Sequence, residues 1–447
     1  MTNSNIEKLL KKAKQPGIDA MKLHPFYKGK IEVVPKCKIN SFDDFGIWYT
    51  PGVAEPCKEI QKNPEKVYDY TNKWNTIAVV SDGTRVLGLG DIGPEAGLPV
   101  MEGKSLLFKY LGGIDAYPIC LDTKDPDDII KTVKLLKPSF GGINLEDIAK
   151  PKCFYILDKL RKEMDIPVWH DDQQGTATIV VAGAINALKL VGKKLDEAVV
   201  SMVGAGAANI AISRVLISAG VKQKNIIMAD SKGVLHKNRK DLEKDKNNNP
   251  TKWDMALKSN SFDRTGDVSD AIKDTDICIA ASKPGPGTIK KEWVAEMSDD
   301  SIVFATANPV PEIWPWEAKE VGVKIFATGR SDFPNQINNS LGFPGIFRGT
   351  LDVQAKTITD EMCIAAAFEL AKTAEDEGLT EEYIVPTMDS WEVFPREAAA
   401  VGMKAISQGI ARKKLSRDEL YNTAMDIIKK SRDETQCLMK NDFIKMP

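Results

Sequence analysis

The sequence predicts an α/β protein: an N-terminal α/β domain, a doubly wound parallel sheet, and helices at the C-terminus. Three observations predict it. Short apolar runs alternate with helix-like segments through most of the chain. One β-branched run leads through closely spaced glycines into an apolar helix. At roughly 150 residues per domain, 447 residues suggest two or three domains.

The apolar runs give the expected strands, which are 76–82, 116–122, 198–204, 225–230, 276–282, 301–307 and 323–329. Helix-like segments at 104–113 and 209–220 lie between them. Beyond about residue 350, we expect helices over 351–376, 395–411 and 416–434. Ser416 and Glu419 have the spacing of a capping box at the start of the last helix. The polar stretch 236–254 is expected to be an exposed loop.

The change in character along the chain suggests two boundaries, near Gly175 and near Phe347. Residues 1–175 would form an N-terminal catalytic domain. Residues 176–346 would form the doubly wound domain. Residues 347–447 would be a helical segment that either forms a small layer or packs back on the first domain.

Composition excludes several classes of protein. A net charge of −2 leaves no broad cationic face, so neither nucleic acid nor an anionic membrane is expected as a partner. The longest apolar stretch is interrupted by Asn186 and Lys189 and is too short to span a bilayer. Seven cysteines without a CxxC pair indicate a reducing compartment, and the N-terminus has no apolar signal core. We therefore expect a cytoplasmic protein.

The segment VVSMVGAGAANIAISRVLISAG has the order of a Rossmann-type dinucleotide site. Gly204 can make the tight turn, and Gly206 allows the backbone to approach a pyrophosphate. The third glycine position holds Asn209, so the match is partial. Asp230 ends the next strand, where a carboxylate can bind the ribose hydroxyl. The alternative is a strand, turn and helix with small residues for packing.

Two acidic pairs follow short apolar runs. Glu146 and Asp147 follow FGGINL, and Asp171 and Asp172 follow IPVWH. Strand ends are where α/β enzymes place ligand-binding groups, and clustered carboxylates suit Mg²⁺ or Mn²⁺. Each pair alone could equally be a helix cap or a solvated turn.

A lysine and a tyrosine complete the candidate site. Lys104 follows a glycine-rich segment at the start of a predicted helix. Beside a cation and partly desolvated, its pKa would be lowered and it could act as a base. The alternative is a solvated surface lysine. Tyr49 precedes a Pro-Gly turn, where buried aromatic packing is an equal explanation.

Taken together, several long segments resemble the malic enzyme family, in the order and spacing of its short, bacterial-type members. They span about residue 24 to about residue 400. The segments are YTPGVAEPC, SDGTRVLGLGDIG, PVMEGK, NLEDI, HDDQQGTA, VGAGAANIA, TANPVPEI and GRSDFPNQINNSLGFPGIFRG.

The resemblance implies a role for each matching position. Tyr49 would be the general acid and Lys104 the general base, with Asp171 tuning Lys104. The remaining roles are metal ligation by Glu146, Asp147 and Asp172; substrate binding by Arg85, Asn308 and Asn338; and cofactor binding by Gly204, Ala205, Gly206, Ala207, Ala208, Asn209, Asp230, Ser231, Lys232 and Asn308. Asn209 departs from the glycine that members of the family usually carry.

The resemblance implies oxidative decarboxylation of (S)-malate to pyruvate and CO₂, with reduction of NAD(P) and a requirement for a divalent metal. It also suggests a homodimer or a larger homo-oligomer. Three alternatives stay open: a malolactic enzyme that returns lactate, a non-catalytic dinucleotide sensor, and an amino-acid dehydrogenase. A sensor would lack at least one of Lys104, Tyr49 or the acidic residues, and all are present.

Cofactor preference is balanced in the sequence. Asp230 favours NAD because a carboxylate repels a 2′-phosphate. Ser231 and Lys232 follow at once and could hold that phosphate. We therefore expect both NAD and NADP to be used.

Overall fold

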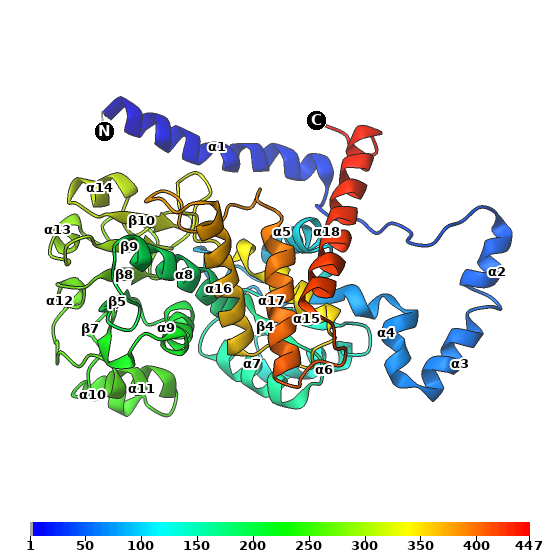
Figure 1. Cartoon of the computed structure of the whole chain (residues 1–447), viewed down its shortest axis with the longest axis horizontal. Helices are drawn as coiled ribbons and strands as arrows, with labels where there is room; N and C mark the ends of the chain where they lie inside the picture. Colours follow the sequence, from blue (N-terminus) through cyan, green and yellow to red (C-terminus); the bar gives the residue numbers. More distant parts are fainter. Residues whose placement is uncertain (1–2) are drawn as a thin grey trace.

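The computed structural model describes residues 3–447, with side chains from residue 14 onward, and contains two separate sheets (Figure 1). The first sheet is four-stranded and parallel, in the order β2-β1-β3-β4. Its strands are β1 (Thr76–Ser81), β2 (Asp115–Cys120), β3 (Gly142–Leu145) and β4 (Val168–His170).

The second sheet is six-stranded, in the order β10-β9-β8-β5-β6-β7, and parallel except for β7. Its strands are β5 (Val200–Val203), β6 (Ile226–Asp230), β7 (Gly233–Val234), β8 (Ile277–Ala280), β9 (Ile302–Ala305) and β10 (Ile325–Thr328). The strand order reverses at β5, as in a doubly wound nucleotide-binding sheet. The predicted α/β class and all seven predicted strands are confirmed.

Helices and short 3₁₀ turns (η) surround both sheets. They are α1 (Asn3–Tyr27), η1 (Phe42–Asp44), α2 (Phe45–Trp48), α3 (Ala54–Lys62), η2 (Pro64–Lys66), α4 (Val67–Tyr70), η3 (Asn72–Asn75), α5 (Pro94–Gly112), α6 (Pro126–Leu136), α7 (Lys152–Glu163), α8 (Asp171–Leu190), α9 (Ala207–Ala219), η4 (Gln223–Asn225), α10 (Lys240–Lys244), α11 (Pro250–Lys258), α12 (Val268–Ile272), α13 (Lys291–Val294), α14 (Pro315–Glu320), η5 (Asn339–Leu341), α15 (Phe343–Asp352), α16 (Asp360–Glu377), α17 (Val393–Ser407) and α18 (Arg417–Lys440). No helix in the described part of the chain has the length and apolarity needed to cross a membrane.

Three sequence expectations need correction. Helix α5 begins at Pro94 rather than near residue 104, because its internal glycines and Pro99 are accommodated within the helix. The stretch 236–254 is not simply a loop, since it contains α10 and the start of α11. The expected helix 351–376 is divided, with α15 ending at Asp352 and Thr359 capping α16. The capping box of Ser416 and Glu419 is confirmed at the start of α18.

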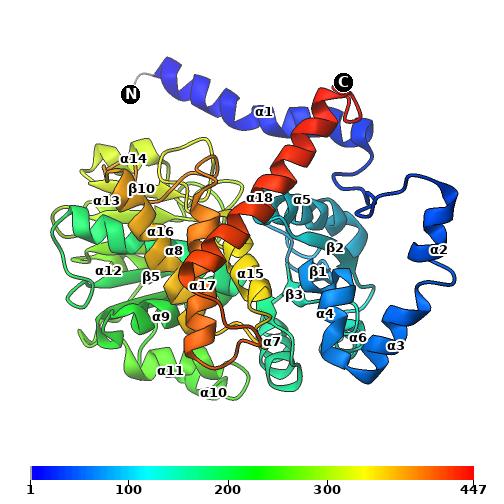
Figure 2. The same ribbon diagram turned by 45° about the vertical axis from the view of Figure 1, so that its right-hand side comes forward.

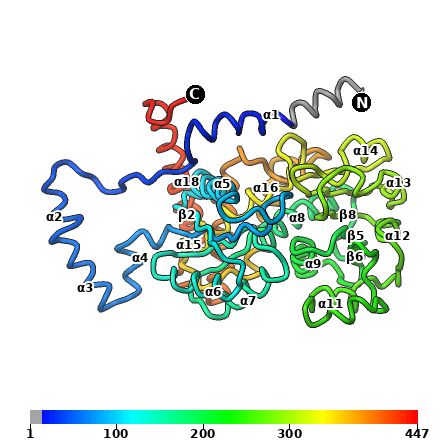
Figure 3. Tube along the Cα trace, turned by 180° about the vertical axis from the view of Figure 1, so that it is seen from behind, coloured from blue at the N-terminus to red at the C-terminus, as the bar shows by residue number. Residues whose placement is uncertain are grey.

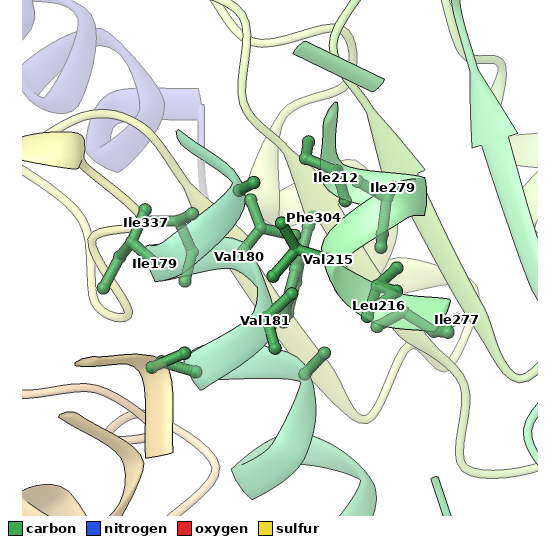
Figure 4. Packing of buried hydrophobic residues seen from close by; sticks show 14 of the residues in the cluster. Ile179, Val180, Val181, Ile212, Val215, Leu216, Ile277, Ile279, Phe304 and Ile337 are labelled. Atoms are coloured by element: carbon green, nitrogen blue, oxygen red, sulfur yellow. The ribbon is translucent and has the colours of Figure 1, made fainter. Parts of the chain in front are cut away.

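Helix α8 joins the two sheets. It begins directly after β4 of the first sheet and packs against α9 of the second. Val180 and Val181 of α8 lie in one core cluster with Val215, Leu216 and Phe304 (Figure 4). The predicted boundary at 175/176 therefore lies within one continuous helix. The boundary at 346/347 likewise lies within α15.

The C-terminal helices pack on the first sheet through α5. Helices α15 and α18 both contact α5, and all three lie side by side in two views (Figures 1 and 2). Phe108 of α5 packs against Phe343 and Phe347 of α15, with ring centroids 4.5 and 5.2 Å apart. This contact holds the start of α15 against the helix that carries Lys104.

Residues 28–67, which we call the arm, extend away from both sheets (Figures 1 and 3). The arm contains α2 and α3, and none of its residues is buried. It exposes large apolar side chains, including Phe42, Ile47 and Trp48. The arm therefore contributes to no core within its own chain.

The α15–α17 contact gives a stability prediction. A Cβ added at Gly349 would lie 2.1 Å from the backbone oxygen of Ala398 in α17. We expect Gly349→Ala to lower the free energy of unfolding by about 1–3 kcal/mol or more, because the helices cannot separate freely. Urea denaturation measures this.

Gly103→Ala is the matched control, since a Cβ added there meets no atom within 4 Å. It should raise stability by roughly 0.5–1 kcal/mol, the usual gain for a helical glycine. Equal effects of the two substitutions would contradict the packing argument.

Candidate active site

Four carboxylates gather at the carboxyl ends of β3 and β4. Glu146 and Asp147 follow β3, and Asp171 and Asp172 open α8 directly after β4. The strands are neighbours in the sheet, so both acidic pairs emerge at the same edge. Glu146, Asp147 and Asp172 each place a ligand atom within 4.8 Å of the others. The structure therefore brings together the three residues predicted to bind metal.

The hydrogen bonds around these acids do not satisfy every carboxylate oxygen. The Asp147 amide donates to Asp172 Oδ2 at 3.0 Å, and Asn144 Nδ2 donates to Glu146 Oε2 at 2.8 Å. Asp147 Oδ2 is buried and has no hydrogen-bond partner among the described residues. Burial, and then the Asp172 carboxylate, raise the pKa of Asp147 to about 8. A site of this kind suits a hard divalent cation, which would offset the repulsion between the acids.

Lys104 is buried beside these acids. Its Nζ lies 2.6 Å from Asp171 Oδ2 and 3.2 Å from Glu146 Oε1, and 4.3 Å from the centroid of the Phe343 ring. Burial lowers the pKa of Lys104, but the Asp171 and Glu146 carboxylates outweigh burial and raise it overall. This raised pKa belongs to the chain without a cation, so the lowered pKa expected for Lys104 beside a bound cation stays a prediction. The alternative of a solvated surface lysine is wrong.

Asn339, which the sequence analysis did not select, belongs to this cluster. Its Nδ2 donates to Asp171 Oδ2. The neighbouring Asn338, predicted to bind substrate, donates to the Gly329 oxygen at 3.2 Å and accepts from the Ser340 amide at 3.0 Å. The paired asparagines are visible in the sequence, but only the turn of η5 decides which one faces Asp171.

Arg85 and Asn308 lie on loops from different sheets. The Arg85 amide donates to the backbone oxygen of Asp147 at 2.9 Å, and its exposed guanidinium donates to the backbone oxygen of Leu87 at 2.5 Å. Asn308 follows β9, and a Cβ added at Gly88 would lie 2.5 Å from its backbone oxygen. The loop after β1 therefore touches the loop after β9.

Tyr49 is not brought to the other site residues within one chain. It ends α2 in the arm and is 73% exposed. Figures 1 and 2 show α2 well away from α5 and α8, which carry Lys104 and Asp171. Buried aromatic packing, the alternative reading of Tyr49, is also wrong for the single chain.

The turn between β5 and α9 has the form that dinucleotide binding requires. Gly204 has a φ of 101°, and a Cβ there would lie 2.7 Å from the Ala281 oxygen. At Gly206, by contrast, an added Cβ would meet only Lys150 Nζ, at 4.0 Å. No other part of the protein fills that space. The absence of a side chain at Gly206 therefore leaves room for a ligand next to the N-terminus of α9.

Asn209 braces this turn. Its Nδ2 donates to the backbone oxygens of Val203 and Gly204, both at 2.8 Å, and the residue is fully buried. Ala208 packs against the core of the second sheet, and Ala207 against that of the first. The Asn209 side chain thus points into the protein and stabilises the turn. Like the glycine that the family usually carries, it leaves the solvent-facing side of the turn unoccupied.

The end of β6 is more cationic than the sequence analysis predicted. Asp230 accepts from both terminal nitrogens of Arg239, at 3.1 and 3.2 Å, and lies 2.6 Å from Lys252 Nζ. Lys232 donates its backbone amide to Asp230, but its Nζ lies 3.4 Å from Asp241. Arg239 and Lys252 come from the polar stretch 236–254. The basic residues of that stretch were the sequence signal for this site.

Lys150 is a further cation that the sequence analysis missed. Its Nζ lies 3.5 Å from the backbone oxygen of Ala205, which lies in the dinucleotide turn between Gly204 and Gly206. Lys150 follows Glu146 and Asp147, the predicted metal ligands after β3, so its contact with Ala205 joins the first sheet to the second.

Comparisons with known proteins agree along most of the chain. The family models described as malic enzyme, N-terminal domain, and malic enzyme, NAD binding domain, match residues 28–161 and 173–406. The bifunctional malic/malolactic enzyme of Bacillus subtilis is 49% identical over 90% of this chain and 96% of its own. The NAD-dependent malic enzyme of Geobacillus stearothermophilus is 50% identical over 86% of this chain and 78% of its own. The crystal structure of Entamoeba histolytica malic enzyme superposes with a TM-score of 0.96 and 46% identity, over 100% of this chain and 93% of that one.

The geometry of the acids predicts a cation site that can be measured without catalysis. We expect the protein to bind Mn²⁺, detected by calorimetry or by loss of the free Mn²⁺ resonance signal. Asp147→Asn should weaken binding at least about tenfold, because losing an outer partner of a metal site already costs that much. Asp91→Asn, an exposed acid paired with Lys124, should leave binding unchanged. Equal Mn²⁺ affinities of the two variants would show that Asp147 is not a metal ligand.

Proposed function

The chain belongs to the malic enzyme family, and on that basis we propose that it oxidises and decarboxylates (S)-malate to pyruvate and CO₂ while reducing NAD(P). The observation that carries this proposal is the buried Lys104–Asp171 pair, which lies beside three clustered carboxylates. A base, a cation site and a dinucleotide turn are the groups that this reaction requires.

We propose Mg²⁺ or Mn²⁺ as the cation, held by Glu146, Asp147 and Asp172. Carboxylate oxygens suit these hard ions, and the buried, unpartnered Asp147 Oδ2 supports the assignment. When bound, the ion would supply a Lewis acid for the carbonyl and carboxylate oxygens of the keto acid.

The chain's own residues account for binding and the first proton transfer. Arg85 would bind a malate carboxylate with its guanidinium fork, and Asn308 and Asn338 would complete the substrate and cofactor contacts. Lys104 would take the proton of the C2 hydroxyl as hydride leaves C2. Asp171 holds Lys104 in place and is itself held by Asn339, so the base is oriented before substrate binds.

After CO₂ leaves, enolpyruvate must be protonated at C3 to give pyruvate, and the described part of one chain brings no acid for that step to this site. We infer that two copies form a homodimer, and that Tyr49 of each copy protonates C3 in the site of the other. The exposed apolar side chains of the arm support this, because surfaces of this kind are usually covered by a partner. A two-fold exchange of arms would cover both surfaces alike.

Complementation between two inactive variants tests the dimer. Lys104→Ala should lower the rate of malate oxidation, and Tyr49→Phe should lower the rate of enolpyruvate protonation. Each loss should be roughly 10²–10⁴-fold. When the two variants are unfolded, mixed equally and refolded, half the dimers should carry both. Each mixed dimer then has one intact site, so about a quarter of wild-type activity should return.

Each variant refolded alone is the control and should stay inactive. If the mixture also stays inactive although mixed dimers form, Tyr49 does not act across the dimer.

A malolactic outcome is the second candidate, since the Bacillus subtilis relative is named bifunctional malic/malolactic. Both reactions use the same acids and Lys104. Net release of NAD(P)H from malate favours the malic reaction, whereas lactate formation without it favours the malolactic one. All the predicted site residues are present, which disfavours a sensor without activity.

We also infer a cytoplasmic enzyme that acts on small molecules. The seven cysteines are free, which fits a reducing compartment. The near-neutral net charge gives no support for nucleic acid as a partner.

We propose that the enzyme uses both NAD and NADP. Asp230 could bind the ribose hydroxyls of NAD, but Arg239 and Lys252 neutralise its charge and hence its repulsion of a 2′-phosphate. Lys252 is the cation closest to Asp230, whereas Lys232 is directed to Asp241.

Cofactor kinetics separate these lysines. We expect Lys252→Ala to raise the KM for NADP about tenfold and that for NAD much less, the size of one lost contact to a charged group. Lys232→Ala should also raise the KM for NADP, but by a smaller factor. Lys258→Ala, in the same helix and paired with Asp254, is the control. Parallel changes in both KM values would exclude Lys252 as the phosphate contact.

A further inference from the structure

Glu312 is a buried carboxylate that the proposed reaction does not use. It lies between β9 and α14, in the segment TANPVPEI, and is fully buried. No lysine, arginine or histidine in the described chain lies within ion-pair distance of it. Burying a carboxylate without an ion-pair partner costs folding free energy, so the hydrogen bonds that compensate Glu312 are informative.

Those contacts join two loops at the carboxyl edge of the second sheet. Glu312 Oε1 accepts from the Ser282 amide at 2.9 Å and from its hydroxyl at 3.2 Å. Glu312 Oε2 accepts from the Ala307 amide at 3.1 Å. Ser282 lies on the loop after β8 and Ala307 on the loop after β9, so one carboxylate fixes both loops.

Each loop lies against a part of the candidate site. A Cβ added at Gly204 would lie 3.1 Å from Ser282 Cβ, so the β8 loop supports the dinucleotide turn. Ala307 precedes Asn308, whose backbone oxygen faces Gly88 on the loop after β1. Glu312 is thus the middle of a series of contacts that runs from the dinucleotide turn to the first sheet.

We propose that Glu312 is a positioning residue whose ionised carboxylate holds the β8 and β9 loops in the form that binds the dinucleotide, so that cofactor affinity falls when Glu312 is protonated. This inference rests on the proposed function and adds to it a pH-sensitive support of the cofactor site.

The chemistry of the contacts explains why protonation matters. The ionised carboxylate accepts charge-assisted hydrogen bonds from both loops, and protonation removes the charge that strengthens these bonds. Burial raises the pKa of Glu312 to about 7, although its hydrogen bonds favour the ionised form. The Cys278 thiol on β8 interacts electrostatically with Glu312, and burial raises the pKa of that thiol to about 12. Cys278 therefore stays neutral while Glu312 titrates.

The sign of the effect follows. Above about pH 7 the carboxylate is ionised and accepts all three hydrogen bonds. Below that pH the protonated carboxyl makes only weaker, neutral hydrogen bonds to the two loops, and the support of Gly204 and of Asn308 is weakened.

Binding of NAD and NADP to the full-length protein, without malate or metal, tests this directly. Calorimetry between pH 5.5 and 8.5 should show wild-type affinity falling by about tenfold on the acid side, because hydrogen bonds to a charged group exceed neutral ones by about this factor. Glu312→Gln should bind about tenfold more weakly at pH 8 and lose this pH dependence. Glu320→Gln, an exposed acid nearby, should behave as wild type.

Ser282→Ala provides a second test, which is valid even if Glu312→Gln does not fold. Removing the hydroxyl donor destabilises the ionised carboxylate, so the midpoint of the pH dependence should move to higher pH. A purely structural role for Glu312 would leave that midpoint in place.

Two results overturn the inference. Wild-type affinity that is flat across this pH range, or an unshifted midpoint in Ser282→Ala, overturns it while leaving the proposed function intact. If wild type binds neither dinucleotide at any pH, both the proposed function and the inference fail.

Discussion

The gathering of four carboxylates, three of them buried, around one lysine is the constraint on which the rest of this structure depends. Glu146, Asp147, Asp171 and Asp172 surround a single buried cation, Lys104. Burial and mutual repulsion raise the pKa of Glu146 and Asp147, so this arrangement costs folding energy. A cation that binds the acids would relieve the cost, which ties the stability of the site to its chemistry.

Elements far apart in the sequence hold this cluster in place. The acids come from the adjacent ends of β3 and β4, and Lys104 comes from the middle of α5. The C-terminal part of the chain then closes the site. The Phe343 ring packs beside the Lys104 ammonium group, and Asn339 bonds to Asp171. The C-terminal helices are therefore part of the site's support.

The parts of the site differ in how firmly one chain holds them. Asn209 braces the dinucleotide turn from below, and Glu312 ties the loops beside it. Tyr49, by contrast, lies on an arm with no buried residue. The fold thus holds the proposed cofactor and base positions within one chain and leaves Tyr49, the proposed acid, on an exposed segment, as the proposed dimer requires.

The sequence by itself determined the α/β class, the strands and the identity of the acids, because these depend on local periodicity and on motifs of consecutive residues. Only the tertiary structure decided that Asn339 faces Asp171 and that Arg239 and Lys252 neutralise Asp230. It also decided that Lys104 has a raised pKa and that Tyr49 lies outside its own chain's site. Burial, charge balance and side-chain direction depend on residues distant in sequence, and no local pattern records which of them come together.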